Sequence, residues 1–151
     1  MADYGQSVAP HSSEQIRYIE SSALLAAILE REAAAVRAVR ARGRRVTSVL
    51  TIAESQRALI RAHATRRIDA TRMRAAARAL RTFSTRCDLV SVTHEVLLRA
   101  GRSFPLEPVR TLDAIHLATA EILGEHPSLI TIVTRDQRIR ENALALGYST
   151  E

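Results

Sequence analysis

The stretch Arg110-Thr-Leu-Asp-Ala-Ile-His-Leu-Ala-Thr-Ala120 decides how the rest of the chain is interpreted. Thr111 is a suitable N-cap, so we expect a helix to begin there. The spacing of its apolar residues marks one face of this helix: Leu112, Ile115, and Ala118 or Thr119. Asp113 and His116 share another face. A carboxylate therefore lies in the first turn of a mostly apolar helix, where the helix dipole favours it even without a further role.

Composition limits the class of protein that carries this helix. The chain has 151 residues, 46% hydrophobic and 25% charged, which is typical of one globular domain. Aromatic residues make up 3%, too few for a surface that stacks single-stranded bases. The single cysteine, Cys87, excludes an internal disulfide framework and a cysteine-rich zinc site. The apolar runs are shorter than a membrane span and no signal peptide is present, so we expect a cytoplasmic protein.

The charge of the chain points to its partners. All 22 basic residues are arginine, and the formal net charge is +6. A charge of this kind favours a polyanion or an acidic protein as partner, although it says nothing about the fold. The absence of lysine can equally reflect codon composition.

Strand and helix patterns alternate along the chain. Residues 1–14 lack periodicity and are expected to form a flexible N-terminal extension, with one domain over residues 15–151. Strands are predicted at 16–19, 45–49, 89–92 and 129–133, and helices at 23–29, 32–42, 51–64, 69–83, 93–102, from 111, and 137–146. Such alternation predicts an α/β fold with a parallel sheet covered by helices. An all-helical protein remains an alternative at this stage.

Four acidic residues fall where ligands bind in such a sheet, beyond the carboxyl ends of the strands. Glu20 ends the first strand, Glu54 follows the second, Asp136 follows the last, and Asp113 begins its own helix. Each has a separate structural explanation. Glu54 completes a capping box with Thr51, and Asp136 can be an N-cap. For the helix that follows Glu20, Ser21 or Ser22 is the predicted N-cap. One shared site explains the four positions more economically.

Four segments together resemble the signature segments of PIN domains, in the same order. They are Tyr18-Ile-Glu-Ser-Ser-Ala-Leu24, Val46-Thr-Ser-Val-Leu-Thr-Ile-Ala-Glu54, Arg110-Thr-Leu-Asp-Ala-Ile-His-Leu-Ala118 and Val133-Thr-Arg-Asp-Gln-Arg138. The resemblance is strongest to VapC-type ribonuclease toxins of bacterial toxin–antitoxin pairs. It implies a three-layer α/β/α sandwich with a central parallel sheet of four to five short strands. It also implies a four-acid site that binds Mg²⁺ or Mn²⁺, endonuclease action on RNA, inhibition by an antitoxin protein, and a homodimer.

The residue types themselves agree with this chemistry. Carboxylates held close together need a compensating cation, and oxygen ligands select a hard ion such as Mg²⁺ or Mn²⁺. One or two such ions can activate water for attack on a phosphodiester and stabilise the leaving oxygen. Glu20 and Asp113 would be the main ligands, Asp136 a further ligand, and Glu54 a ligand or a residue that holds a water molecule of the metal.

Two hydroxyl residues and one substitution complete the predicted site. Ser22 and Thr134 can orient the carboxylates, although helix capping explains Ser22 equally well. The family has aspartate where this chain has Glu20. The extra methylene displaces the carboxylate, and Mg²⁺ demands near-ideal distances of about 2.0–2.1 Å. A catalytically degenerate PIN-like binding module is therefore the alternative function.

His116 and the arginines have simpler interpretations. His116 can pass as a general base, but a buried, hydrogen-bonded residue is the better interpretation because a metal site removes the need for one. An arginine-rich segment comprises Arg57, Arg61, Arg66, Arg67, Arg72, Arg74, Arg78 and Arg81. These side chains can contact phosphates or an acidic antitoxin, or form a solvated helical face, and we prefer the solvated face. An arginine-rich helical nucleic-acid binder without chemistry is the remaining hypothesis.

Overall fold

The computed structural model describes residues 14–151, so the extension predicted for residues 1–14 lies outside the described residues except for Glu14. Five strands form one sheet in the order β3-β2-β1-β4-β5, and every pair in it is parallel. The strands are β1 (Ile16–Ile19), β2 (Arg44–Ser48), β3 (Asp88–Val90), β4 (Ile130–Val133) and β5 (Ser149–Thr150). The helices are α1 (Ser21–Ile28), α2 (Ala33–Arg40), α3 (Val49–Ala64), α4 (Ala70–Ser84), α5 (His94–Ala100), α6 (Thr111–Ile122) and α7 (Gln137–Ala145).

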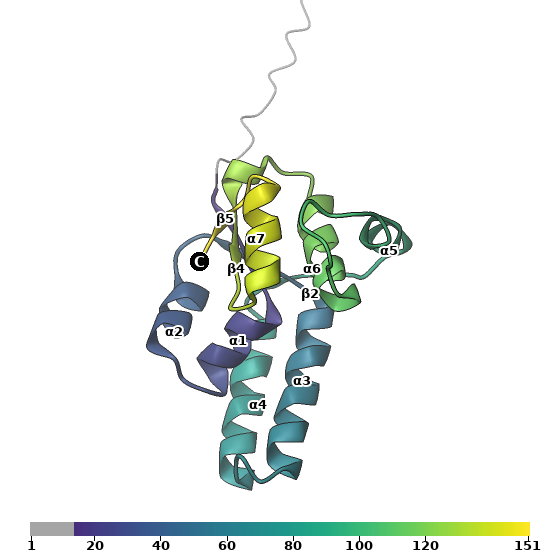
Figure 1. The fold of residues 1–151 in the computed structure, drawn as a ribbon. Coiled ribbons are helices and arrows are strands. Elements are labelled where there is room, and N and C mark those ends of the chain that lie inside the picture. The colour runs from purple at the N-terminus through teal and green to yellow at the C-terminus, as the bar shows by residue number, and fades with distance from the viewer. Residues whose placement is uncertain (1–13) are drawn as a thin grey trace, which may run out of the picture.

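Helices cover both faces of the sheet and make three layers (Figure 1). The buried residues of α1 to α4 pack together with Ile19 and Val133. Those of α5, α6 and α7 pack with Tyr18, Val46 and Ile132 on the other face. The α3–α4 hairpin extends beyond the sheet (Figure 1). The predicted α/β/α sandwich with a parallel sheet is confirmed, and an all-helical fold is excluded.

The central strands are buried because they have neighbours on both sides and helices on both faces. All four residues of β1 are buried, and β1 pairs in parallel with β2 and β4. The strand predicted at 129–133 begins one residue later, since Pro127–Leu129 forms a 3₁₀ turn. Strand β5 was not predicted, because a two-residue strand is too short to show a periodic pattern.

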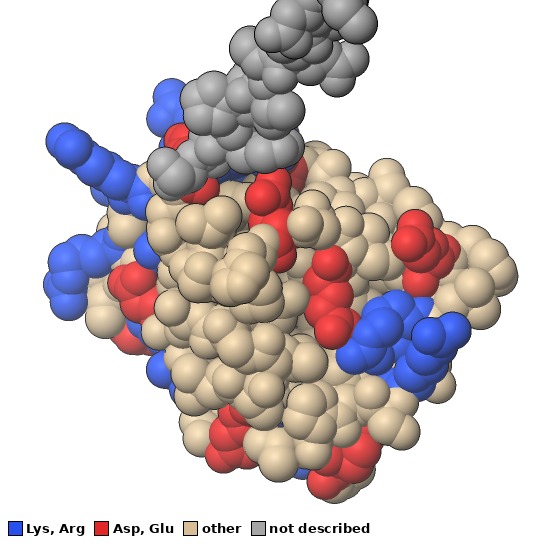
Figure 2. Space-filling view, turned by 90° about the horizontal axis from the view of Figure 1, so that it is seen from above, with Lys and Arg blue, Asp and Glu red and all other residues tan. Residues whose placement is uncertain are grey.

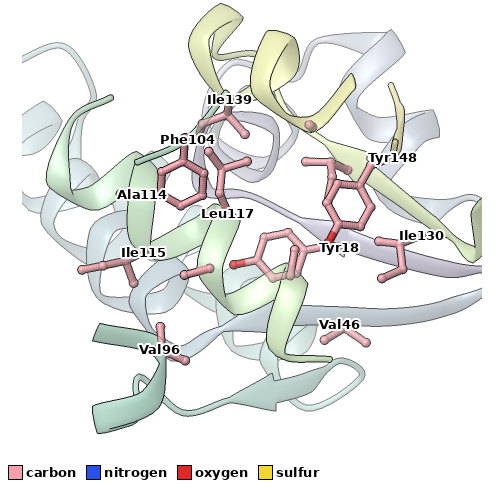
Figure 3. Packing of buried hydrophobic residues seen from close by; sticks show 14 of the residues in the cluster. Tyr18, Val46, Val96, Phe104, Ala114, Ile115, Leu117, Ile130, Ile139 and Tyr148 are labelled. Carbon is pink, nitrogen blue, oxygen red and sulfur yellow. The ribbon is translucent and has the colours of Figure 1, made fainter. Parts of the chain in front are cut away.

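One of the two cores places a tyrosine among aliphatic side chains. Figure 3 shows Tyr18 between α6 and the sheet residues Val46 and Ile130. Tyr18 and Leu117 are each 1% exposed. A buried phenol needs a hydrogen-bond partner for its hydroxyl, and this requirement links the core to the site described below.

Three helix starts differ from the sequence prediction. Helix α1 is capped by the side chain of Glu20, which accepts from the backbone N–H of Ser22, so neither Ser21 nor Ser22 is the N-cap. Helix α3 begins at Val49 with Ser48 as its N-cap. The capping box predicted for Thr51 and Glu54 is therefore wrong, because both residues lie inside the helix. Ser48 is the last residue of β2, and its hydroxyl accepts from the backbone N–H of Leu50, so the helix begins immediately after the strand.

Helix α6 begins one residue earlier than its predicted cap allows. Arg110 occupies the N-cap position without a side-chain cap bond, so Thr111 is the first helical residue. The apolar face predicted from Leu112, Ile115, and Ala118 or Thr119 is buried except at Leu112, which is 46% exposed. From Asp113 to Ala120 every residue is buried. The helix packs against α5, α7 and the sheet, so almost no side of it faces solvent.

The arginine-rich segment lies mainly on exposed positions of α3, α4 and their connection, with Arg72 half-buried, as a solvated helical face requires. Figure 2 views the molecule from above relative to Figure 1, so it shows the end opposite the α3–α4 hairpin; basic side chains lie there in separate groups. Acidic and uncharged atoms lie between them, so this face carries no continuous basic surface. Within residues 14–151, no helix combines the length and apolarity needed to span a membrane.

The burial of α6 predicts how two leucines of this helix differ. Leu117→Ala removes a side chain that is 1% exposed, and we expect it to lower the free energy of unfolding by about 2–5 kcal/mol. Leu112→Ala, in the same helix but exposed, is the matched control and should change it by about 0.5 kcal/mol or less. Urea denaturation followed by circular dichroism measures both. Equal losses for the two variants would contradict the burial described for α6.

Candidate functional site

The acidic residues lie at one edge of the sheet because parallel strands end on the same side. The backbone N–H of Glu20 donates to the carbonyl oxygen of Val133 at 3.0 Å, so the ends of β1 and β4 lie side by side. Strand β2 pairs with β1 and leads directly into α3, which carries Glu54. The side chains that follow these three strands therefore meet at the carboxyl edge.

Glu20 is the most enclosed of the four acids, with its side chain 5% exposed. Its Oε1 accepts from the Ser21 hydroxyl at 2.6 Å and from the Ser22 backbone N–H at 3.0 Å. Its Oε2 accepts from the Thr134 hydroxyl at 2.8 Å and from the Ser22 hydroxyl. Four donors match the roughly four lone-pair positions of a carboxylate. This side chain therefore caps α1 and, through Thr134, ties the end of β4 to it.

His116 connects Glu20 with Glu54. Its Nε2 lies 2.7 Å from Glu54 Oε2 and 3.9 Å from Glu20 Oε1, and its side chain is 1% exposed. Its Nδ1 lies 3.0 Å from the hydroxyl of Tyr18. Burial raises the pKa of the Tyr18 phenol far above its ordinary value, so the hydroxyl keeps its proton. The ring is thus held from the core side by Tyr18 and presents Nε2 to the carboxylates.

Arg110 connects the other two acids. Its Nε donates to Asp113 Oδ2 at 2.8 Å, and its Nη2 lies 3.5 Å from Asp113 Oδ1 and 2.9 Å from Asp136 Oδ2. The second oxygen of Asp136 accepts from the backbone N–H groups of Arg138 and Ile139, which caps α7 as predicted. The hydrogen bond to Asp113, above all, raises the pKa of the Arg110 guanidinium.

The two groups of acids belong to one hydrogen-bonded network. The Thr134 hydroxyl donates to Glu20 and accepts from the backbone N–H of Asp136 at 3.0 Å. Asp113 and His116 lie one turn apart on α6, both buried. The structure therefore gathers the four predicted acids at one edge as two groups. Glu20 and Glu54 share His116, and Asp113 and Asp136 share Arg110.

The donor set fits a divalent cation. Ligand atoms of Glu20, Glu54 and His116 all lie within 4.8 Å of one another. Two carboxylates and an imidazole suit Mn²⁺, and the additional carboxylate oxygens suit Mg²⁺ as well. Within the described residues, the hydrogen bonds leave Glu54 Oε1 and one lone pair or more of Asp113 free to accept another partner. One guanidinium cannot neutralise four carboxylates, so the site attracts a further positive charge.

The sequence did not predict the contacts of three residues in this site. It did not assign a role to Arg110 or Tyr18, and it treated His116 as a packed residue without foreseeing its bond to Glu54. His116 is indeed buried and hydrogen-bonded. The available signal was spacing, since Arg110 lies three residues before Asp113 and His116 three residues after it, and helical residues at this spacing are neighbours.

Comparisons with known proteins agree on the fold and the family. The sequence model of the PIN domain matches residues 17–144. Ribonuclease VapC46 of Mycobacterium tuberculosis is 42% identical over 134 residues, which cover 87% of this chain and 93% of the relative.

Two solved structures share the fold at low sequence identity. The VapBC2 structure from Rickettsia felis, bound to a DNA fragment from its promoter, has a TM-score of 0.61 at 12% identity and covers 90% of this chain and 97% of that one. VapBC-1 from nontypeable Haemophilus influenzae has a TM-score of 0.58 at 14% identity and covers 90% and 96%. With a family match over most of its length and a relative of 42% identity, the chain belongs to the PIN domain family.

Proposed function

We propose that this protein is a metal-dependent endoribonuclease that acts as the toxin of a toxin–antitoxin pair in the cytoplasm. The observation that carries the proposal is the single network that joins Glu20, Glu54, Asp113 and Asp136 at the carboxyl edge of the sheet. The identity of 42% to a relative named ribonuclease VapC46 supports the same chemistry. In this proposal the substrate is RNA and the reaction is hydrolysis of a phosphodiester.

The proposed cofactor is Mg²⁺ or Mn²⁺, held by the four acids. Glu20 and Asp113 would be its main ligands, Glu54 a ligand or a residue that orients water, and Asp136 a further ligand. Such an ion supplies Lewis acidity toward the phosphate and lowers the pKa of water. Ser22 and Thr134 orient the Glu20 carboxylate through their hydroxyl groups, and His116 orients the Glu54 carboxylate through Nε2.

Glutamate at position 20 can be interpreted in two ways, as part of an active nuclease site or as the mark of a site that has lost catalysis. Its carboxylate uses four donors that converge on it, so its length matches this pocket. Three of these donors come from hydroxyl groups, which rotate away more easily than a backbone N–H when another partner arrives. We therefore favour an active site, and a degenerate binding module is the alternative.

An antitoxin is the proposed protein partner, because the two structural neighbours described above are VapBC complexes by name. A cleft of about 370 Å³ between α1, α2 and α4 offers a surface for it. Apolar side chains that include Leu24, Val36 and Phe83 line this cleft, together with Arg40, Arg45 and Arg86. We propose that it binds an antitoxin segment with apolar and acidic residues. A homodimer is also proposed, from family resemblance.

Of the predictions that follow from the proposed function, the first concerns Asp113. Asp113→Asn keeps the shape of the side chain but removes its charge. We expect RNA cleavage and growth inhibition to fall by about 100-fold or more. Mutation of a residue that only orients a metal ligand already lowers metal affinity or activity by about 10–100-fold. Cleavage of total RNA by purified protein in EDTA, Mg²⁺ and Mn²⁺ measures the effect. Asp88→Asn, an exposed acid paired with Arg44 at the start of β3, is the matched control. Full activity in Asp113→Asn would show that the assigned site is wrong.

The second prediction separates an active site from a degenerate one. Glu20→Asp shortens the side chain by one methylene and pulls the carboxylate away from Thr134 and Ser22. We expect cleavage to drop about 10-fold or more, because the donors that orient this carboxylate are lost. The same RNA assay measures it, with thermal unfolding as a check on folding. A Glu20→Asp variant that cuts RNA while the wild type does not would instead establish the degenerate alternative.

The third prediction tests the cleft as the antitoxin surface. Ala79 lines the cleft and is exposed, so Ala79→Glu introduces bulk and a negative charge without touching the acidic site. We expect RNA cleavage to be unchanged and the antitoxin concentration needed for half-inhibition to rise about tenfold or more, because like charges at an interface are costly. Ala64→Glu, exposed at the end of α3, is the control. Normal inhibition of Ala79→Glu would remove the cleft from the proposal.

A further inference from the structure

Arg110 is the one positive side chain that the hydrogen-bond network of residues 14–151 places against two of the predicted acids at once. Asp113 belongs to α6 and Asp136 to the start of α7, so the guanidinium bridges two separate elements. An ordinary exposed pair on a helix surface contributes little. This one differs, because the carboxylates it joins are only 10% and 25% exposed.

Most of the acceptor positions of Asp136 are occupied when Arg110 forms this bridge. Asp136 Oδ1 accepts from the N-terminal N–H groups of α7, and Asp136 Oδ2 accepts from Arg110 at 2.9 Å. Asp113 is less committed, because its Oδ1 lies 3.5 Å from the guanidinium. Asp113 can therefore serve Arg110 through Oδ2 and another cation through Oδ1. Asp136 accepts three hydrogen bonds, so while Arg110 stays it can offer a metal no more than one lone pair of Oδ2.

The start of helix α6 fixes the backbone of Arg110. Its backbone is extended at the N-cap of α6, and its carbonyl oxygen accepts from the N–H of Ala114 at 2.9 Å. The side chain therefore starts from a fixed point one turn before Asp113. A guanidinium is not deprotonated in proteins, so Arg110 remains charged at every physiological pH.

We propose that Arg110 takes the place of a second metal ion, so that the site holds one divalent cation, served by Glu20, Glu54 and Asp113, beside a permanent guanidinium on Asp113 and Asp136. This inference rests on the proposed metal-dependent function and departs from it at one residue, Asp136, which here pairs with Arg110 and is not a ligand of the ion. Within residues 14–151 no hydrogen bond uses Nη1 of Arg110, and the side chain is 61% exposed. The two N–H donors of Nη1 therefore have no hydrogen-bond partner among these residues, and free guanidinium donors can bind a phosphate.

Counting bound Mn²⁺ tests the inference without relying on activity. Electron paramagnetic resonance of the free ion, titrated against the full-length protein, gives the number of sites. We expect about one ion per chain for the wild type and for Arg110→Lys, which keeps the charge. For Arg110→Gln and Arg110→Met we expect about two, because removing the guanidinium leaves Asp113 and Asp136 uncompensated. Arg138→Gln, an exposed arginine of α7, controls for general loss of positive charge and should bind about one.

The outcomes separate this inference from the proposed function. Two ions in the wild type, or one ion in both neutral variants, would overturn the role of Arg110 while leaving a metal-dependent nuclease intact. No Mn²⁺ in any variant would overturn the inference together with the metal requirement of the proposed function. Circular dichroism of each variant confirms folding. Arg110→Lys keeps the positive charge but not the shape of the guanidinium, so one bound ion in this variant shows that the charge, and not the shape, excludes a second ion.

Discussion

The site depends on electrostatic repulsion that the fold itself creates. A parallel sheet directs the ends of β1, β2 and β4 to one edge, and the residues that follow include several carboxylates. Like charges at short range are unfavourable unless donors and cations compensate them. Serine and threonine hydroxyls serve Glu20, an imidazole serves Glu54, and a guanidinium serves Asp113 and Asp136. Each compensating group is supplied by a residue near a strand end or on α6.

Sequence periodicity predicted a parallel sheet covered by helices, because strands and helices alternate and an apolar run at 129–133 suits a buried strand. The family resemblance then implied the three-layer sandwich. Periodicity failed for β5, which is too short to have a pattern. It also failed to show that the apolar Leu112 is exposed in the first turn of α6 while the polar Asp113 and His116 are buried. The positions of the four acids followed from topology. The partners of those acids did not, since Arg110 and Tyr18 act through contacts between elements.

Glu20 both caps helix α1 and belongs to the acidic site. The sequence offered a helix cap and a shared site as competing explanations for the acids near helix starts. In the structure Glu20 caps α1 and accepts from Thr134 at the end of β4, and Asp136 caps α7 and contacts Arg110. A longer side chain at position 20 can fold back onto its own helix while it remains at the edge of the sheet. A capping role is therefore no evidence against a functional one.

The bond between Tyr18 and His116 has an evolutionary consequence. Tyr18 belongs to the most central strand and packs in the hydrophobic core, yet its hydroxyl lies 3.0 Å from the ring that holds Glu54. Phenylalanine at position 18 would preserve the packing but leave Nδ1 of the buried imidazole without its partner, while Nε2 keeps Glu54. An apolar residue at position 116 would leave the Tyr18 hydroxyl without the imidazole. Neither position can drift alone at low cost, so descendants of this chain are constrained to exchange the two residues as a pair or retain both.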